Sequence, residues 1–507
     1  MAFKESDTLK GDSMCNKRFF FFLLLSFVSL QAGIGLTAHE PSPAHKKENS
    51  PQKISLEARA IPGRSETMLV GDYEVFEDRK TRRGRKINLH ITILPATGPE
   101  HAPDPIFFLA GGPGQAATSL AAMLASSPLR RNRDIVLVDQ RGTGRSNPLQ
   151  CNLSGSLDDL QGYLDELFSL DALQKCREEL QKIADLRLYT TPIAMDDLNE
   201  VRQALRYDKI NLMGGSYGTR AALVYMRRHP ESVRAAVIKG VAPIAFTNPL
   251  HHARGAQDSL DLIFEECLKD TECNRAFPNL KTKFDAIAAR LKKGAVDVSI
   301  SHPTTRKPAL VKLSYDAFAE GLRVMTYSSS ATRLVPLMID LAYGGNYGPF
   351  TERALASNRA LREQLHFGML LSVVCAEDVP RIDPKRIEQE TAGTYLGDVR
   401  VRGQMAVCDI WPRGEVPASY GQPVRASTPT LVISGKFDPV TPPRWGAEAA
   451  RHLPNSLHVI TPNHHDLSGP CIDSMTEQFL ASASVKGLDT SCAKMMRRQT
   501  FRLSLSQ

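Results

Sequence analysis

Short apolar runs alternate with longer helical patterns along most of the chain, and this alternation limits the folds that are open to it. Each run has about the length of one buried strand, and most are followed within two residues by glycine or aspartate. The runs are residues 106–109, 135–138, 210–213, 235–238, 430–433 and 457–460. Strands that are buried on both faces are typical of parallel sheets, because helices cover both sides of such a sheet. The pattern predicts an α/β fold with a mostly parallel central sheet flanked by helices.

The predicted strands fall into two groups that are separated by a long, mainly helical stretch. The first group lies in residues 66–246, which we interpret as the N-terminal part of the sheet-containing core, and the second lies in residues 427–507, its C-terminal part. Residues 247–426 between them are predicted to form a cap over the carboxyl edge of the sheet. Within this insertion, the alternating apolar residues of 296–300 and 310–313 indicate a small hairpin.

The N-terminal region has the order of features of a secretory signal peptide. Lys17 and Arg18 precede an apolar run at 19–36, and the run ends in small residues. We therefore predict a signal peptide over residues 1–38, followed by a polar, flexible leader at 39–65. The alternative is a membrane anchor, since about 18 apolar residues nearly span a bilayer. The first interpretation implies an exported protein, periplasmic or secreted, with no stable membrane insertion after the signal is cleaved.

The chain has nine cysteines, of which Cys15 lies in the predicted signal peptide. The other eight stand in neighbouring couples, and an oxidising compartment would allow four disulfides. The nearest-neighbour pairs are Cys151–Cys176, Cys267–Cys273, Cys375–Cys408 and Cys471–Cys492. Because eight cysteines allow many connectivities, other pairings and buried free thiols stay open. The lack of Cys-x-x-Cys argues against a zinc ribbon or a thioredoxin-like site.

The most informative turn is Gly-Gly-Ser-Tyr-Gly at residues 214–218, which follows a predicted strand and precedes the helical run 219–228. This context is that of a nucleophile elbow, in which a sharp turn holds a serine above the sheet. Small residues are needed two positions before and after the serine, because larger side chains would meet the neighbouring strand and helix. We therefore predict that Ser216 is a catalytic nucleophile, the alternative being a glycine-rich turn without a catalytic role.

A serine hydroxyl is a poor nucleophile at neutral pH, so Ser216 needs a general base and an acid that orients the base. On sheets of this kind the acid and the histidine follow the serine along the chain, in that order. Asp438 lies just beyond a predicted strand, and we predict that it is the acid, with Asp466 a weaker candidate. The alternative is that Asp438 is a turn or N-cap residue before the helix that starts near Arg444. His465, in the loop after the last strand, is the predicted base, with His464 as the alternative.

Acyl transfer also needs N–H groups that stabilise the negatively charged oxygen of the intermediate. Gly-Gly-Pro-Gly at 111–114 follows an early strand, where such a loop belongs, and we assign this role to the backbone N–H groups of Gly112 and Tyr217. The alternative for this glycine loop is an ordinary turn between a strand and a helix. Residues 139–146 are also glycine-rich but lack the ending of a P-loop, so we interpret them as a structural turn. No H-E-x-x-H motif accompanies the histidines, and we predict neither a metal nor an organic cofactor.

Four motifs together resemble those of α/β-hydrolase peptidases of the prolyl aminopeptidase and tripeptidyl aminopeptidase type. They are Ala-Gly-Gly-Pro-Gly at 110–114, Asp-Gln-Arg-Gly-Thr-Gly-Arg-Ser at 139–146, Gly-Gly-Ser-Tyr-Gly at 214–218 and Gly-Lys-Phe-Asp-Pro-Val-Thr-Pro at 435–442. Residues 408–412, Cys-Asp-Ile-Trp-Pro, are similar to the C-terminal region of tripeptidyl-aminopeptidase-like (TAP-like) proteins. The resemblance runs from about residue 70 to the C-terminus and implies an α/β-hydrolase fold with a Ser-His-Asp triad.

The resemblance also implies peptide substrates with a free N-terminus, because members of this family release residues from that end. They hold the substrate ammonium with acidic residues of the cap, and Glu377 and Asp378 lie where the resemblance places such acids. A solvated charge pair or a helix cap is the alternative for these two residues. Departures from the family pattern leave the substrate preference open: Ala110 replaces a histidine, and His464 and Asp466 stand where many members have glycine.

Charge and composition exclude other classes of function. The net charge is +8 over 507 residues, without a long Lys/Arg run, so a nucleic-acid partner is not indicated.

We expect an exported serine hydrolase, an aminopeptidase that releases N-terminal residues or tripeptides through an acyl-enzyme. An esterase or other small-molecule hydrolase on the same scaffold is the main alternative, because the cap decides the substrate. A non-catalytic binding module is less favoured, since every catalytic role has a candidate, and the oligomeric state is not indicated.

Overall fold

The computed structural model describes residues 54–154 and 158–505, and these residues belong to one compact unit. The predicted signal peptide lies outside the described residues, as does the leader up to residue 53. In the part of the chain that is described, no helix has both the length and the hydropathy needed to cross a membrane.

The prediction of a flexible leader was wrong for the residues of β1 (Glu57–Ala60), which form a strand. This strand pairs antiparallel with β2 (Thr67–Asp78). All four of its side chains are exposed, so β1 lacks the apolar alternation by which a strand is predicted, and backbone hydrogen bonds to β2 hold it.

Among the described residues, nine strands form one sheet in the order β1-β2-β3-β5-β4-β6-β7-β10-β11. The strands beyond the first two are β3 (Arg83–Leu94), β4 (Ile106–Leu109), β5 (Ile135–Val138), β6 (Ile210–Gly215), β7 (Val233–Lys239), β10 (Thr430–Gly435) and β11 (Ser456–Thr461). Pairing is antiparallel from β1 to β5 and parallel from β5 to β11. The six predicted apolar runs are all strands of this sheet, so the prediction of a mostly parallel sheet is confirmed. The carboxyl ends of the parallel strands therefore meet at one edge.

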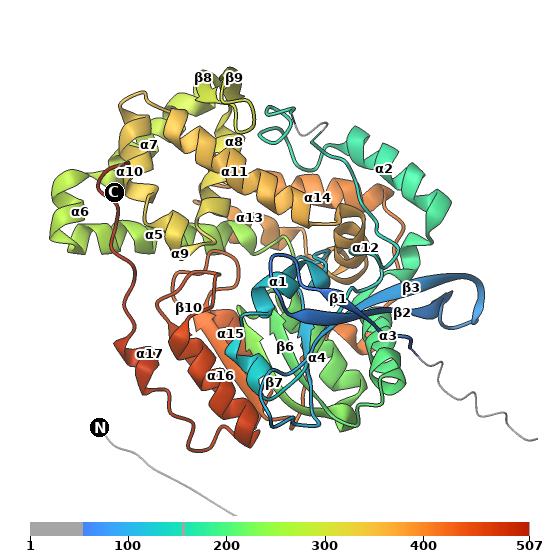
Figure 1. Ribbon diagram of the computed structural model, residues 1–507. Helices are drawn as coiled ribbons and strands as arrows, with labels where there is room; N and C mark the ends of the chain where they lie inside the picture. Colours follow the sequence, from blue (N-terminus) through green and yellow to red (C-terminus); the bar gives the residue numbers. More distant parts are fainter. Residues whose placement is uncertain (1–53, 155–157, 506–507) are drawn as a thin grey trace, which may run out of the picture. The chain divides into compact units, whose positions relative to one another are not determined.

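Helices cover both faces of the sheet, because successive strand residues point to opposite sides. Val136 and Val138 of β5 pack into the core that includes α3 and α4. Ile135 and Leu137 of the same strand pack into the core on the other face, which includes α16. The helices near the sheet are α1 (Ala121–Leu124), α2 (Leu170–Ile183), α3 (Thr191–Ala204), α4 (Tyr217–Arg228), α15 (Pro443–Ala450), α16 (Pro470–Ser482) and α17 (Ser491–Met495). Figure 1 shows α4 and α16 on either side of β7.

A mainly helical region with its own hydrophobic core follows β7 along the chain. Its elements are α5 (His252–Lys269), α6 (Thr271–Ala276), α7 (Leu280–Lys293), β8 (Val296–Ser301), β9 (Pro308–Leu313), α8 (Tyr315–Met325), α9 (Ser329–Thr332), α10 (Val335–Tyr343) and α11 (Gly348–Gln364). The β8–β9 pair is the hairpin that the sequence predicts. Phe284, Phe318 and Phe350 pack in this core, with successive ring centroids 6.1 and 4.5 Å apart. In Figure 1 the region lies above β6, β7 and β10.

The packing differs from the predicted cap boundary at residue 426. The next helices are α12 (Phe367–Glu377), α13 (Lys385–Thr391) and α14 (Val399–Ile410), and α12 and α14 contribute to the same core as α3 and α4. Every residue of α12 is buried, and a helix that is mostly apolar around its circumference lies inside the protein. The Cys375–Cys408 disulfide joins α12 to α14. The other predicted pairs that lie at disulfide distance among the described residues are Cys151–Cys176, Cys267–Cys273 and Cys471–Cys492.

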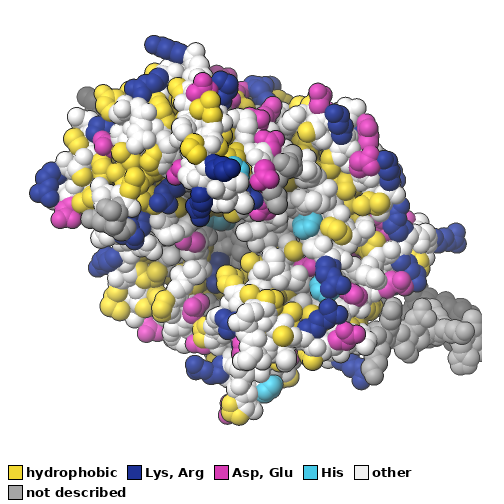
Figure 2. All heavy atoms as spheres, turned by 45° about the horizontal axis from the view of Figure 1, so that its top comes forward, with side chains coloured by type: hydrophobic (Ala, Val, Ile, Leu, Met, Phe, Trp, Pro, Cys, Tyr) yellow, Lys and Arg dark blue, Asp and Glu magenta, His cyan; other side chains and the backbone are white. Residues whose placement is uncertain are grey.

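The outer surface carries charges of both signs. Over the face shown in Figure 2, Lys and Arg side chains stand among Asp and Glu side chains. Ion pairs between side chains of opposite charge include Arg228–Asp196, at 2.6 Å, and Lys312–Asp297, at 2.8 Å. A surface that binds nucleic acid gathers its positive charge on one face, and the face in Figure 2 has no such patch.

Candidate active site

Ser216 lies in a strained turn between β6 and α4. Its backbone has φ 55° and ψ −125°, a conformation that is costly for a residue with a side chain. Two glycines make the turn possible: a Cβ on Gly214 would collide with the carbonyl oxygen of Gly218, and one on Gly218 would collide with that of Leu109. The turn leaves Ser216 partly exposed at the carboxyl edge of the sheet, which is the geometry of a nucleophile elbow.

Asp438 and His465 form a hydrogen-bonded pair beside this edge. The Nδ1 atom of His465 lies 2.7 Å from Oδ2 of Asp438, whose side chain is fully buried. The same carboxylate accepts hydrogen bonds from the backbone N–H of Val440, at 2.8 Å, and from that of Thr441, at 2.9 Å. The backbone N–H of His465 donates to the carbonyl oxygen of Tyr327 at 3.0 Å. These contacts fix both the carboxylate and the imidazole.

The electrostatics of the pair favour a general base. Burial by itself would lower the pKa of His465, but the adjacent Asp438 carboxylate outweighs it and raises that pKa above the ordinary value. Burial would likewise raise the pKa of Asp438, whereas the charge and hydrogen bond of His465 lower it. Because Nδ1 faces the carboxylate, Nε2 is the ring nitrogen that is left to act on a hydroxyl proton.

His464, the alternative base, has a different environment. It is buried, its ring stacks on Phe437 with centroids 5.4 Å apart, and burial lowers its pKa to about 4. Asp466, the weaker candidate for the acid, accepts hydrogen bonds from the backbone N–H and the hydroxyl of Ser329, at 2.8 and 2.6 Å. The geometry therefore favours His465 as the base and gives Asp466 a structural contact with α9.

A cavity of about 220 Å³ brings the other predicted catalytic residues together. Its lining includes Ser216, His465, Gly112 and Tyr217. Gly112 has φ 108°, and a Cβ on the neighbouring Gly111 would lie 3.3 Å from the Cβ of Ser216. The glycine loop thus lies against the predicted nucleophile, which is where donors for an oxyanion are needed.

The structure does not bring Glu377 to this cavity, so its predicted contact with a substrate ammonium is corrected. Glu377 is buried at the end of α12 and is absent from the described cavity lining. Its carboxylate accepts hydrogen bonds from the backbone N–H and hydroxyl of Thr191 and from the hydroxyl of Tyr420. Burial raises the pKa of Glu377 to about 7. Sequence reasoning missed this because the burial depends on how α12 packs against distant segments.

Asp378 does line the cavity, but its charge already has partners. Both carboxylate oxygens lie 2.8 Å from Nη1 of Arg220, and Oδ1 also accepts a hydrogen bond from Arg381 at 3.0 Å. A carboxylate that is shared between two guanidinium groups has little negative charge left for a substrate ammonium.

Sequence reasoning also missed three arginines of the cavity lining, which are Arg220 in α4, Arg323 in α8 and Arg400 in α14. Arginines at isolated helical positions are usually solvent-exposed, so the sequence carries no local signal for them. Their positions follow from the packing of three helices that are far apart along the chain.

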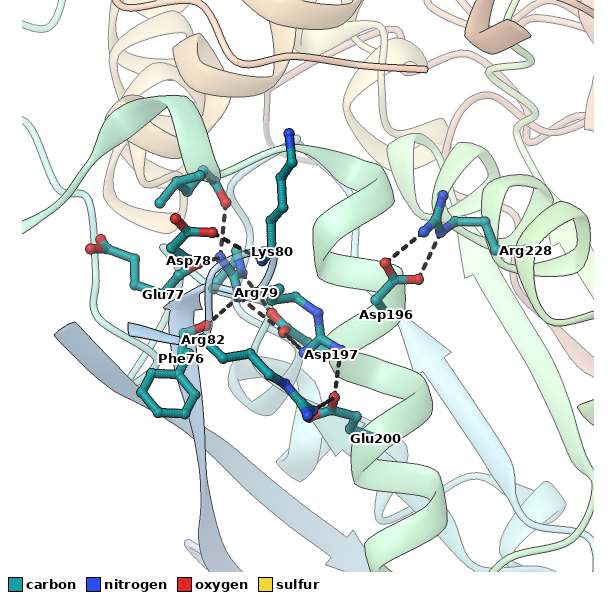
Figure 3. Close-up of polar contacts among 12 residues, drawn as sticks. Phe76, Glu77, Asp78, Arg79, Lys80, Arg82, Asp196, Asp197, Glu200 and Arg228 are labelled. Carbon is teal, nitrogen blue, oxygen red and sulfur yellow. Dashed lines mark hydrogen bonds and ion pairs between the residues drawn. The ribbon is translucent and has the colours of Figure 1, made fainter. Parts of the chain in front are cut away.

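The glycine-rich residues 139–146 form a turn that an ionic network anchors. Arg141 is fully buried, and its Nε lies 2.6 Å from Oδ2 of Asp197. Asp197 also accepts a hydrogen bond from Arg79 at 2.7 Å, and Arg79 in turn donates to Glu200 at 2.6 Å. Figure 3 shows Asp197 and Glu200 on one helix, facing Arg79. These contacts agree with the interpretation of this motif as a structural turn.

The fold and this site together define the class of protein: the chain has the α/β-hydrolase fold. Residues 104–275 match the family described as alpha/beta hydrolase fold, and residues 393–492 match the family described as TAP-like protein. The resemblance that the four sequence motifs predict is therefore confirmed.

The proteins to which the chain is similar include peptidases. A crystal structure of proline iminopeptidase from Mycobacterium smegmatis aligns with a TM-score of 0.38 and 15% identity, over 81% of this chain and 98% of that one. Proline iminopeptidase of Neisseria gonorrhoeae is 28% identical over 137 residues, 27% of this chain and 32% of that protein. The serine protease Hip1 of Mycobacterium tuberculosis (strain H37Rv) is 25% identical over 498 residues, 89% of this chain and 92% of that protein. The sequence matches to Hip1 and to the Neisseria iminopeptidase, together with the match to the alpha/beta hydrolase family, indicate a hydrolase that resembles serine peptidases.

Proposed function

We propose that this chain is an exported serine peptidase that releases residues from the N-terminus of peptides. The observation that carries the proposal is the geometry around one cavity: the partly exposed Ser216 in its strained turn, and His465 held by the buried carboxylate of Asp438. The similarity to the serine protease Hip1 and to proline iminopeptidases supports peptides as the substrate class.

The proposed reaction proceeds through an acyl-enzyme. The Oγ atom of Ser216 attacks the scissile carbonyl carbon while Nε2 of His465 takes its proton, and Asp438 stabilises the resulting imidazolium. The N–H groups of Gly112 and Tyr217 hold the oxyanion. His465 then gives the proton to the leaving amine, the carbon–nitrogen bond breaks, and the acyl group stays on Ser216. His465 then takes a proton from a water molecule, which attacks the ester carbonyl. The proton returns to Oγ of Ser216, and the product leaves as a carboxylate.

Export is the second part of the proposal. The signal-like N-terminal sequence and the four cysteine pairs at disulfide distance in the described chain support an oxidising compartment. Periplasmic or secreted protein that is purified without reductant should carry no free thiol in these pairs, which a thiol titration measures.

Recognition of a free N-terminus is the most specific part of the proposal. It is inferred from the resemblance to aminopeptidases. Asp378 is the carboxylate that lines the cavity among the described residues, but Arg220 and Arg381 already share its charge, so this part of the proposal rests on the resemblance alone. The test compares tripeptidyl anilides with a free and with an acetylated amine, beside short acyl esters. The proposal is supported if the wild-type protein cleaves the free-amine peptides and Ser216→Ala does not. Ester turnover without any peptide cleavage would instead establish the esterase alternative.

A further inference from the structure

The charged side chains at the cavity have more positive than negative charge. In the first cluster, Glu320 accepts a hydrogen bond from Nε of Arg323 at 2.7 Å and another from Nη1 of Arg400 at 2.9 Å. One carboxylate is therefore shared by two guanidinium groups, and both of these arginines line the cavity. The cluster retains a surplus of one positive charge.

The second cluster also has more positive than negative charge. Asp378 is shared by Arg220 and Arg381. The nearby carboxyl of Glu377 has its pKa raised to about 7 by burial, so at neutral pH it carries only part of a negative charge. Burial also lowers the pKa of His252 in the cavity lining well below its ordinary value, which leaves this ring neutral. The Asp438 carboxylate beside His465 adds one more negative charge, so the four arginines of the two clusters outnumber the three carboxylates Glu320, Asp378 and Asp438 by one.

Two of the guanidinium groups also have an unused donor. The Nε atoms of Arg220 and Arg400 are buried and have no hydrogen-bond partner within the described chain. A buried N–H of a charged group that lacks an acceptor is costly, and an anionic oxygen is the partner that suits it best. The face shown in Figure 2, by contrast, carries side chains of both signs of charge.

The first cluster lies close to the proposed base. Nη1 of Arg323 donates to the hydroxyl of Tyr327 at 2.5 Å, and the ring centroid of Tyr327 lies 5.3 Å from that of His465. An anionic group that contacts the Glu320–Arg323–Arg400 cluster would therefore belong to a substrate part near the scissile bond.

We propose that the cavity binds a carboxylate of the substrate, the side chain of an acidic peptide residue near the cleaved bond, and that Arg400 determines this specificity. The inference deepens the proposed peptidase function and rests on it. Arg400 suits the role for two reasons. Glu320 remains paired with Arg323 when Arg400 is changed, and the Nε atom of Arg400 has no hydrogen-bond acceptor within the described chain.

The experiment uses tripeptidyl anilides that carry Glu or Gln at each position in turn, each with a free and with an acetylated amine. We expect kcat/KM of the wild-type protein to be about tenfold or more higher for Glu than for Gln at one position. In Arg400→Gln this ratio should fall to near one, and Arg400→Lys should restore part of it. Arg402→Gln is the matched control, because Arg402 lies on the same helix and is exposed.

A wild-type protein that cleaves Glu and Gln peptides equally at all positions would overturn the inference, as would an unchanged ratio in Arg400→Gln. A binding measurement separates this failure from failure of the proposed function. Calorimetry on Ser216→Ala should show tighter binding of the Glu peptide than of the Gln peptide, whether or not hydrolysis occurs. If no peptide is cleaved but the preference in binding holds, the peptidase proposal fails and carboxylate recognition stands.

Discussion

Replacing Asp438 by asparagine tests the coupling of the acid to the base. The Asp438 carboxylate is buried, lies 2.7 Å from Nδ1 of His465 and accepts backbone hydrogen bonds from Val440 and Thr441. The amide oxygen of an asparagine can keep the backbone contacts, so the loop should fold. Its NH₂ group would then face Nδ1, which forces the imidazole into the tautomer with the proton on Nε2. A ring in that state cannot take the proton of Ser216.

The expected loss follows from the chemistry of such triads. Inversion of the tautomer costs about 10⁴-fold in kcat, which is about 5 kcal/mol of transition-state stabilisation. The pH dependence should change as well, because activity needs the neutral imidazole. The raised pKa of His465 places the rise in wild-type activity above the ordinary histidine value of about 6.5, and loss of the carboxylate should move the residual rise to lower pH.

The assay is kcat/KM against pH for the best peptide anilide, with circular dichroism as the check on folding. Asp466→Asn is the matched control, since Asp466 is next to His465 in sequence but contacts Ser329. It should stay within about tenfold of wild-type activity. A folded Asp438→Asn protein with more than about a tenth of wild-type activity would refute the assigned role, and so would an equal loss in Asp466→Asn.

Three further predictions concern the elbow, a buried acid and a disulfide. Gly214→Ala should abolish folding or activity, because the added Cβ would collide with backbone atoms. Gly215→Ala should express and remain active, because a Cβ there has no atom within 4 Å. Thermal melts and anilide assays compare the two variants. The pKa of Glu377 is about 7 in the folded protein against the ordinary value of 4.5, so between these pH values the folded state binds a proton that the unfolded state has lost. The free energy of unfolding should therefore fall by about 3 kcal/mol as pH rises from 4.5 to 7. Denaturant titrations should find a weaker dependence of this free energy on pH in Glu377→Gln. The double change Cys375→Ala and Cys408→Ala should cost about 2–4 kcal/mol in unfolding, and an unchanged melting temperature would contradict the disulfide.

The parts of the fold that depend on local sequence could be predicted well. The apolar strands, the hairpin of β8 and β9 and the glycines around Ser216 each follow from side chains within a few residues of one another. β1 could not be predicted, because its exposed Glu-Ala-Arg-Ala side chains carry no apolar pattern. The cap boundary could not be predicted, because a mostly apolar helix such as α12 can be buried in either of two cores.

The candidate site, like the fold, could be predicted only in part from the sequence. Ser216, Asp438 and His465 each follow a predicted strand, and a parallel sheet brings such positions to one edge. The environments of Glu377 and Arg400 depend on contacts with segments far away in the sequence, Thr191 for the first and Glu320 for the second. The sequence could therefore indicate the chemistry of the reaction but not the charge of the cavity that receives the substrate.

The most direct test of the account is covalent labelling of the folded protein with a fluorophosphonate, followed by peptide mapping in a mass spectrometer. The account predicts one adduct on the peptide that contains Ser216, formed faster as His465 loses its proton and absent in Ser216→Ala. A folded protein that stays unlabelled, or that carries the adduct on another residue, would contradict it.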